Sequence, residues 1–377
     1  MKFQSLQLKC NPPKPLLTIG SIVAVLCCST LGLNASVHAK SVEVSQATQD
    51  MTPPNYFQHP LFIKLLNELE RDHQFSRVDL LELFQDVKQQ KSILEAMSRP
   101  AEKTKTWDEY KPIFVNQTGI DKGLVFWDKH AKTLTRAAKK YQVPEAIIVS
   151  IIGVETRYGT YMGKHRIIDS LATLGFDYPA RSDFFYGELK NFLILTRQLE
   201  WDPLVPKGSY AGAMGFGQFI PSSYLKLAID FNEDGKTDLI GSVDDAIGSI
   251  ANYFQFHGWQ AGQEVLVPAQ LTEQNLSPKA EKLFNKPLKP KVSLAQAAKN
   301  GIMPLHPIKD KPLVRPFSFQ NAEQTEIWLG LNNFFVITEY NHSKLYARAV
   351  YELAKALEEN TDNQSAVSLV TDSDRFE

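Results

Sequence analysis

The fold is decided by one stretch of the sequence, Pro144-Glu-Ala-Ile-Ile-Val-Ser-Ile-Ile-Gly-Val-Glu155-Thr-Arg-Tyr-Gly159. Its β-branched residues would suit a buried strand. Its length, a proline where a helix begins and a glycine where a helix ends favour a helix instead. Apolar residues occur on every side of the helix axis, so we expect this helix to be buried all round.

Glu155 falls in the last turn of this predicted core helix. Burial disfavours the charged carboxylate, and so does the negative end of the helix dipole, so both effects raise the pKa expected for Glu155. A carboxyl group that stays protonated near neutral pH is what general-acid cleavage of a glycosidic bond needs. The alternative is an ion pair with Arg157 or another cation that only holds the helix end, and the pattern alone slightly favours this alternative.

A second informative stretch is rich in small residues and leads into a helix: Ser209-Tyr-Ala-Gly-Ala-Met-Gly-Phe-Gly217-Gln218-Phe219-Ile-Pro-Ser-Ser-Tyr224. Its glycines let the backbone approach a ligand closely, while Gln218, Tyr210 and Phe219 offer a polar group and flat apolar rings. Proteins bind sugars through aromatic faces and through hydrogen bonds to the ring edges. The alternative is a tight turn with core aromatic residues. It is not a phosphate loop, because no Gly-Lys-Ser/Thr follows.

A third stretch resembles the first nine positions of an EF-hand calcium loop, with oxygen ligands at positions one, three, five and nine, a glycine at six and a carbonyl at seven. The predicted ligands are Asp230, Asn232, Asp234, Lys236 and Asp238. Helical patterns flank the loop. Position twelve departs from the EF-hand pattern because Gly241 replaces the bidentate glutamate, and Asp244 or Asp245 is the nearest substitute. We expect a weak structural calcium site, and a solvated acidic turn is the alternative.

Helical periods dominate the chain from His59 onward, and short strands and loops rich in proline and lysine replace them after Gly258. Helix resumes after Ser343, a predicted N-cap. The predicted fold class is therefore mainly α, in the α+β sense. Two apolar stripes are each expected to lie on one helix face: Phe62, Leu65, Leu66 and Leu69 in the first, and Trp127, Ala131, Leu134, Ala138 and Tyr141 in the second.

The first 39 residues predict export. Lysines precede an apolar stretch from Leu16 to Leu33, and small residues up to Ala39 provide a cleavage site. A retained membrane anchor is the alternative. Glycine, serine and threonine interrupt the apolar stretch, which favours cleavage and a periplasmic location. Leu26 before Cys27, and Cys27 before Cys28, argue against lipid anchoring to the outer membrane, so at most peripheral membrane contact is expected.

Composition excludes several classes of protein. All three cysteines precede Ala39, so the mature chain has no disulfide, thiolate nucleophile or cysteine metal site. Removal of the signal peptide changes the formal charge from −1 to −4, whereas a nucleic-acid-binding protein would have a basic surface. The eight histidines form no pair at metal-ligand spacing on a helix, which disfavours a zinc hydrolase.

Three motifs together resemble the membrane-bound lytic murein transglycosylase B family. They are Glu155-Thr-Arg-Tyr-Gly, the run from Ala211 to Tyr224 and Tyr340-Asn-His-Ser, and they fall in the order of the family. The resemblance extends from about His59 to the last helix. It implies a lysozyme-like helical core with a small β insertion and additional N-terminal helices. It also implies a metal loop at the position of the EF-hand pattern.

The resemblance implies roles for individual residues. Glu155 matches the single catalytic acid/base of the family. The residues that match its substrate-binding cleft are Tyr110, Arg181, Ser209, Gln218, Tyr253, Tyr340, Asn341 and Tyr346. No cofactor is needed for catalysis, and the expected partners are peptidoglycan glycan strands and other cell-wall enzymes.

We therefore expect a lyase that cleaves the β-1,4 bond between N-acetylmuramic acid and N-acetylglucosamine and leaves 1,6-anhydro-muramic acid ends. Ordinary glycosidases use two carboxyl groups, but Asp183 and Asp202 have no context that supports a second one here. A muramidase that uses water and a non-catalytic wall-binding module are the alternatives.

The expected divisions are a signal peptide (1–39), a flexible linker (40–55), an N-terminal helical region (56–142), a catalytic core with the calcium loop (143–262), a small β and loop insertion (263–330), a C-terminal segment and helix that complete the cleft (331–360) and a disordered tail (361–377).

Overall fold

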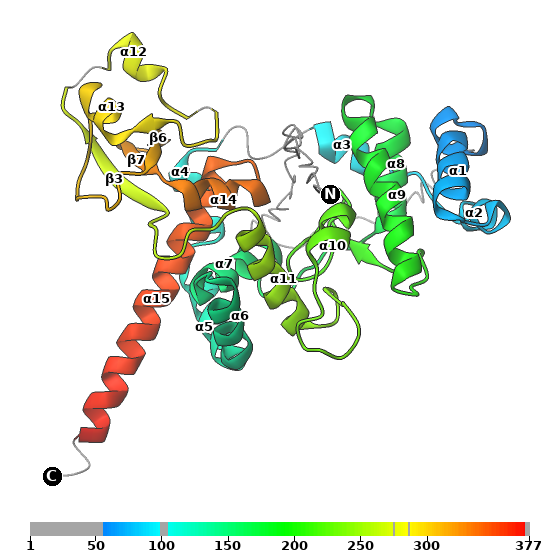
Figure 1. Cartoon of the computed structure of the whole chain (residues 1–377), viewed down its shortest axis with the longest axis horizontal. Helices are drawn as coiled ribbons and strands as arrows, with labels where there is room; N and C mark the ends of the chain where they lie inside the picture. Colours follow the sequence, from blue (N-terminus) through cyan, green and yellow to red (C-terminus); the bar gives the residue numbers. More distant parts are fainter. Residues whose placement is uncertain (1–55, 99–104, 274–275, 286, 374–377) are drawn as a thin grey trace, which may run out of the picture.

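The computed structural model describes residues 56–98, 105–273, 276–285 and 287–373, so the predicted signal peptide and linker lie outside the described residues. The predicted fold class is confirmed, because helices dominate and the strands form small antiparallel sheets (Figure 1). The helices are α1 (Pro60–His73), α2 (Arg77–Leu83), α3 (Lys91–Ser98), α4 (Trp107–Tyr110), α5 (Gln117–Lys129), α6 (Ala131–Tyr141), α7 (Glu145–Thr156), α8 (Ile167–Asp177), α9 (Ser182–Gln198), α10 (Pro221–Leu227), α11 (Val243–Phe256), α12 (Pro278–Glu281), α13 (Leu294–Lys299), α14 (Asn332–Tyr340) and α15 (Lys344–Ser373), with short 3-10 turns η1 (Tyr56–Gln58), η3 (Lys111–Ile113) and η4 (Pro179–Arg181). The strands are β1 (His165–Arg166), β2 (Lys207–Gly208), β3 (Leu266–Leu271), β4 (Val292–Ser293), β5 (Ile302–Pro304), β6 (Leu313–Gln320) and β7 (Thr325–Gly330).

Helix α7 lies at the centre of the main helical body, where it packs against α5, α6, α11 and α15 (Figure 1). Every residue of α7 after Glu145 is buried. The prediction of a helix that is apolar and buried all round is confirmed, and the strand alternative is wrong. Because four helices surround α7, the position of its last turn is fixed from several sides.

The end of α7 differs from the prediction, which places the cap at Gly159. The helix ends at Thr156, and Arg157 takes the left-handed conformation with φ 50° while its N–H donates to the Gly153 carbonyl at 3.0 Å. Gly159 also has a positive φ, 81°, and a Cβ atom there would lie 2.2 Å from the ring of Phe216. Glycine is therefore needed at position 159 for the close approach of Phe216, and arginine tolerates the cap position at a modest cost.

We expect Gly159→Ala to lower the free energy of unfolding by about 1–3 kcal/mol, because the new methyl group adds both backbone strain and a clash. Gly258→Ala is the matched control, since Gly258 has a similar φ of 86° and a Cβ atom there would have no neighbour within 4 Å. Urea unfolding of both variants separates the two contributions. Equal losses would show that the contact with Phe216 contributes nothing.

The remaining helices pack around this centre. Helices α8 and α9 lie side by side, α1 covers α9, and α3 covers α8. The first predicted apolar stripe is confirmed, because Phe62, Leu65, Leu66 and Leu69 are all buried in α1. The second stripe, from Trp127 to Tyr141, is wrong as a single helix. The chain breaks at His130, so Trp127 belongs to α5 and the other members belong to α6.

Strands β3 to β7 form a separate part of the fold, which we call the β-module (residues 266–330, with α12 and α13). Its sheet has the strand order β4-β6-β7-β3-β5. A core of its own lies on one face of the sheet, with Val267, Ile302, Val314 and Leu329 fully buried. The other face of β6 joins the main core through aromatic residues, so the β-module is held against the start of α15 (Figure 1).

Helix α15 differs from the prediction of a disordered tail at 361–377. The helix continues beyond residue 360 and ends at Ser373 (Figure 1). Its N-terminal turns are packed, with Tyr346, Val350 and Leu353 buried. A helix that packing has nucleated adds further residues at little cost, because each added residue gains one backbone hydrogen bond. The predicted N-cap is present, since Ser343 Oγ accepts a hydrogen bond from the Tyr346 N–H at 3.3 Å. None of the described helices has both the length and the apolar character needed to cross a bilayer.

Candidate active site

Glu155 lies in the last turn of α7, with only 8% of its surface exposed. The Tyr346 hydroxyl, from α15, donates a hydrogen bond of 2.5 Å to Glu155 Oε1. Arg157, the predicted alternative partner, has an exposed side chain and lines a cavity of about 240 Å³ beside α5. The structure thus places the carboxyl group against a buried tyrosine from the C-terminal helix.

Two further tyrosines lie close enough for the Glu155 charge to affect them. Tyr253 on α11 and Tyr340 on α14 have ring centroids 4.7 Å apart. The Tyr340 hydroxyl donates to the Gly217 carbonyl at 2.6 Å, and the Tyr253 hydroxyl donates to the Glu339 carbonyl at 2.7 Å. These bonds tie α11, α14 and the glycine-rich loop together beside the end of α7.

The tyrosines around Glu155 stay protonated. Burial raises the pKa of Tyr340 and that of Tyr346 well above the usual value of 10, and the Glu155 charge raises both further. Burial also raises the pKa of Tyr253, with smaller contributions from Glu339 and Glu155. Phenols in this state act as neutral hydrogen-bond donors, so these tyrosines add no negative charge beside Glu155.

The glycine-rich loop packs directly against the end of α7. Met214 and Phe219 exchange two backbone hydrogen bonds of 3.0 Å, which closes the loop between them. The Thr156 hydroxyl lies 3.0 Å from the Phe216 carbonyl oxygen. Gln218 is buried, and its amide nitrogen donates to the Met162 carbonyl at 3.1 Å. The loop therefore joins the residues that follow Glu155 to the tyrosine cluster.

Ser209 and Asn341 lie at the ends of segments that flank this loop. Ser209 Oγ accepts a hydrogen bond of 3.0 Å from the Ala213 N–H, which holds the start of the loop in a turn. Asn341 is the C-cap of α14, is 4% exposed and directly follows Tyr340. Both residues are thus placed by the elements that carry the loop and the tyrosines.

Tyr110 and Arg181 differ in their relation to Glu155. Tyr110 on α4 is buried, and it contributes to the raised pKa of Tyr346, so it belongs to the same cluster. Arg181 is the last residue of η4 and the N-cap of α9, and its guanidinium lies 4.3 Å from the ring centroid of Phe184. Burial lowers the pKa of Arg181. Its contacts are with the start of α9 rather than with the tyrosines.

Two ionisable groups near these elements, the half-buried His257 and the buried Glu188, were not predicted from the sequence. The His257 ring lies 4.2 Å from the Tyr253 ring, and burial, with a smaller contribution from Lys226, lowers the His257 pKa to about 4. Glu188 on α9 is 5% exposed, accepts a 2.9 Å hydrogen bond from the Ser222 N–H, and has a pKa raised by burial. Only the helical period of α9 could have indicated that Glu188 faces inward.

The predicted calcium loop connects α10 and α11 and is held in shape by backbone hydrogen bonds to its own carboxylates. Backbone N–H groups of Asp234 and Gly235 donate to the Asp230 carboxylate, at 3.2 and 2.8 Å, and the Lys236 N–H donates to Asp234 at 2.9 Å. Gly235 has a φ of 88°. Within the described residues, no three acidic, histidine or cysteine side chains converge as a metal site. Asp230, Asp234 and Asp238 are therefore not gathered as a metal site in this part of the structure, although carboxylate, amide and carbonyl oxygens are the ligand types that calcium binds.

Of the two candidate substitutes for the twelfth ligand, Asp245 reaches into the loop, whereas Asp244 bonds to α6. Asp245 is fully buried and accepts hydrogen bonds from the Phe231 and Asp238 N–H groups, at 2.8 and 2.9 Å. Asp244 accepts from the Thr133 hydroxyl at 2.8 Å. A Cβ atom on Gly241 would lie 2.5 Å from Asp238 Oδ2. Asp238 thus occupies the space that a side chain at the twelfth position would need.

Comparison with known proteins agrees with this architecture. The family described as the transglycosylase SLT domain matches residues 59–355. Membrane-bound lytic murein transglycosylase B of Escherichia coli (strain K12) is 40% identical over 312 residues, which are 80% of this chain and 84% of the relative. The structure of catenated lytic transglycosylase SltB1 from Pseudomonas aeruginosa is 44% identical with a TM-score of 0.77, and the match covers 81% of this chain and 99% of that one.

The structure of the Escherichia coli lytic transglycosylase Slt35 in complex with calcium is 39% identical with a TM-score of 0.75. That match covers 84% of this chain and 98% of the other. The predicted lysozyme-like architecture and the predicted resemblance are both confirmed by these matches. The chain therefore belongs to the lytic murein transglycosylase B family, whose members carry the transglycosylase SLT domain.

Proposed function

We propose that Glu155 is the only acid/base of this peptidoglycan lytic transglycosylase, and that the bond cleaved is the β-1,4 bond between N-acetylmuramic acid and N-acetylglucosamine. The observation that carries the proposal is the position of Glu155, buried at the end of α7 with Oε1 accepting the Tyr346 hydrogen bond. In a protonated carboxyl group the carbonyl oxygen accepts and the hydroxyl oxygen donates. The transferable proton therefore belongs on Oε2.

Two proton transfers by Glu155 account for cleavage without water. Glu155 gives its proton to the glycosidic oxygen as the bond to the anomeric carbon breaks, and the N-acetyl oxygen of the muramic sugar bonds to that carbon. The ionised Glu155 then takes the proton of the C6 hydroxyl, whose oxygen displaces the N-acetyl oxygen and closes the 1,6-anhydro ring. Glu155 ends protonated, so it is ready for the next cleavage.

A single carboxyl group suits this scheme because the substrate supplies the nucleophile. A two-carboxyl glycosidase would need a second Asp or Glu at a defined separation across the sugar. Glu188, the other buried glutamate near these elements, binds the N-terminus of α10 through Ser222. Its contacts support a structural role at that helix end.

The cleft residues are proposed to hold the strand. Ser209, Gln218, Tyr253 and Asn341 would hold sugars or the reacting N-acetyl group, and Tyr110, Arg181, Tyr340 and Tyr346 would line the groove. Support is strongest for the residues of the tyrosine cluster, because they surround Glu155. Support for Arg181 is the family match alone.

We also propose a structural calcium ion held by Asp230, Asn232, Asp234, Asp238 and the carbonyl of Lys236, as the calcium complex of Slt35 suggests. Calcium would neutralise the carboxylates of this turn and fix the connection between α10 and α11. It takes no part in the chemistry at Glu155.

Calcium is expected to raise the melting temperature by about 2–5 °C relative to a chelator, at a concentration near ten times the dissociation constant. Asp234→Asn should remove most of this rise. Gly241→Glu, which restores the EF-hand pattern, should not strengthen binding, because its side chain would displace Asp238. Equal melting temperatures with calcium and chelator would rule out the site.

The proposed location is the periplasm, after export and cleavage near Ala39. Glycan strands of peptidoglycan are the proposed partner, and other cell-wall enzymes are further candidates. The lysine-led apolar start of the chain supports export.

Mass spectrometry of the fragments released from purified sacculi tests the proposed function. Fragments with anhydro-muramic ends, lighter by one water molecule than reducing fragments, are the expected result. Reducing ends would identify a muramidase instead. Binding to sacculi with no release of fragments would identify a wall-binding module.

A further inference from the structure

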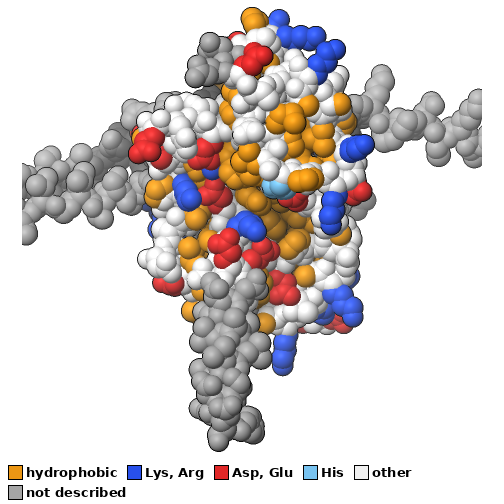
Figure 2. Space-filling view, turned by 90° about the vertical axis from the view of Figure 1, so that its left-hand side faces the viewer, with side chains coloured by type: hydrophobic (Ala, Val, Ile, Leu, Met, Phe, Trp, Pro, Cys, Tyr) orange, Lys and Arg blue, Asp and Glu red, His pale blue; other side chains and the backbone are white. Residues whose placement is uncertain are grey.

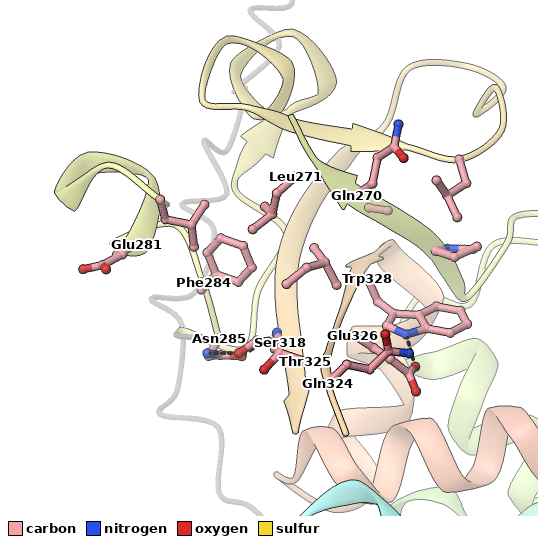
Figure 3. A pocket seen from close by; sticks show the side chains of 15 residues that line it. Gln270, Leu271, Glu281, Phe284, Asn285, Ser318, Gln324, Thr325, Glu326 and Trp328 are labelled. Carbon is pink, nitrogen blue, oxygen red and sulfur yellow. Dashed lines mark hydrogen bonds between the residues drawn. The ribbon is translucent and has the colours of Figure 1, made fainter. Parts of the chain in front are cut away.

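A cavity of about 730 Å³ opens in the β-module, where it is lined by residues other than those around Glu155 (Figure 3). Strands β3 and β7 contribute Leu271, Ile327 and Trp328, and the segment after α12 contributes Phe284. Figure 2 shows hydrophobic side chains gathered in a hollow on the side of the molecule that carries the β-module. A cavity of this size takes a ligand of two or three sugar rings.

The lining favours an uncharged ligand with one apolar face. Exposed Gln270, Gln324 and Thr325 at the rim supply amide and hydroxyl groups that both donate and accept hydrogen bonds. The charged side chains among the described lining residues are Glu281 and Glu326, with no lysine or arginine. Glu326 is paired with Arg348 of α15, and no cation among these lining residues is available to bind an anionic ligand such as a peptide that ends in free carboxylates. Rings with hydroxyl and acetamido groups fit this chemistry.

Trp328 is held as a rigid platform at one side of the cavity (Figure 3). Its indole Nε1 donates a hydrogen bond of 2.8 Å to Glu326 Oε2. The guanidinium of Arg348, on α15, lies 4.8 Å from the indole ring centroid. A ring that is already ordered loses little conformational entropy when a ligand stacks on it.

Helix α15 separates this cavity from Glu155. Successive residues of a helix are turned by about 100°, so Tyr346 points to the side opposite Lys344 and Arg348. Tyr346 bonds Glu155. Lys344 bonds Asn285 Oδ1 at 3.0 Å and the Ser318 carbonyl at 2.5 Å, and both of these residues line the cavity. The cavity of the β-module and the surroundings of Glu155 therefore contact opposite sides of the same turns of α15.

We propose that the cavity of the β-module is a second binding site for the glycan strand, and that it takes N-acetylated amino sugars stacked on Trp328. This inference rests on the proposed function, because it assigns to the cavity another part of the same substrate. A strand held at two places has a raised effective concentration at the catalytic residue. The cavity strengthens binding only of strands that are long enough to reach both the cavity and Glu155.

Co-sedimentation with glycan strands that an amidase has freed of peptides tests the proposal, with Glu155→Gln as the background so that nothing is cleaved. Trp328→Ala removes the platform, and Trp328→Phe keeps a flat ring. Gln324→Ala changes the rim and leaves the platform in place. Leu313→Ala is the control, since Leu313 is 53% exposed on β6 and lies outside the cavity. Melting temperatures identify any variant that fails to fold.

Trp328→Ala is expected to weaken binding about fivefold to tenfold, with Trp328→Phe and Gln324→Ala between it and the parent. In the active chain, Trp328→Ala should slow release from sacculi and leave the rate on a tetrasaccharide unchanged. Unchanged binding by both Trp328→Ala and Gln324→Ala would overturn the proposal. Competition by free stem peptides, with no binding to peptide-free strands, would overturn it in favour of a peptide site. Fragment release by Glu155→Gln would count against the proposed function alone.

Discussion

Glu155→Gln is expected to lower the rate of fragment release from sacculi by about a thousandfold or more. General acid–base catalysis contributes about 10²–10⁴ to a rate. Here one group serves both the protonation and the later deprotonation, so its loss affects both steps. The glutamine side chain has nearly the same shape and can still accept the Tyr346 hydrogen bond through its oxygen, so the fold should be preserved. Release of labelled fragments with time measures the loss.

Glu188→Gln is the matched control for this result. Glu188 is as buried as Glu155, at 5% against 8% exposed, and it lies on a different helix, α9. Its replacement should cost stability at the start of α10 and leave most of the activity in the folded protein. A Glu155→Gln protein that retained more than about a tenth of the parent rate would contradict the assignment of Glu155.

Arg348→Ala is expected to lower the free energy of unfolding by about 3–5 kcal/mol, the cost of breaking a buried ion pair. The Arg348 side chain is 3% exposed and pairs with Glu326 and, at 2.7 Å, with Glu352. Its guanidinium also lies 4.3 Å from the Trp107 ring centroid and 4.5 Å from that of Phe319. Removal of the cation leaves the partly buried Glu326 carboxylate without this partner at the junction of the β-module and α15, whereas Glu352 keeps its ion pair with Lys111 at 2.8 Å.

Lys64→Ala is the control for Arg348, because Lys64 pairs with Glu68 at 3.8 Å and its side chain is 56% exposed. Pairs of that kind contribute less than about 1 kcal/mol. Chemical unfolding of both variants gives the comparison. A loss for Arg348→Ala no larger than that for Lys64→Ala would show that the junction does not depend on the cation.

The difference between the parent and Arg348→Ala should shrink in acid. Burial alone would raise the pKa of Glu326, but hydrogen bonds from Trp328 and Arg348 and the Arg348 charge hold it below its usual value of 4.5. A carboxyl group with a lowered folded-state pKa stabilises the protein above the unfolded-state pKa, and this contribution is lost as the pH falls through the folded-state value. The parent should therefore lose stability below about pH 4.5, while the variant loses less.

The sequence was sufficient to predict the centre of the molecule. The run from Ile147 to Val154 is apolar on every side, and its length with the flanking Pro144 and Gly159 favours an enclosed helix over a buried strand. The calcium-loop pattern was visible for a similar reason, because the residues of a turn are close in the sequence. Local sequence features therefore predict the buried helix and place Glu155 in its last turn, whereas the catalytic role of Glu155 comes from the resemblance to the family.

Contacts between distant residues could not be read from the sequence. The pair of Arg348 with Glu326 joins β7 to α15, and no local period indicates it. The need for glycine at position 159 comes from Phe216, 57 residues further along the chain. The break at His130 was missed because α5 and α6 each present apolar residues at compatible spacing. In each case tertiary packing decided between local patterns that the sequence left equivalent.

The origin of the oxygen at the new strand ends tests most directly the claim that Glu155 cleaves the strand without water. Purified sacculi would be digested in water enriched in oxygen-18, and the released fragments would be weighed by mass spectrometry. If the muramic C6 hydroxyl closes the ring, the fragments carry no heavy oxygen and are lighter by one water molecule than reducing fragments. Incorporation of heavy oxygen into the muramic ends of most fragments would contradict the account.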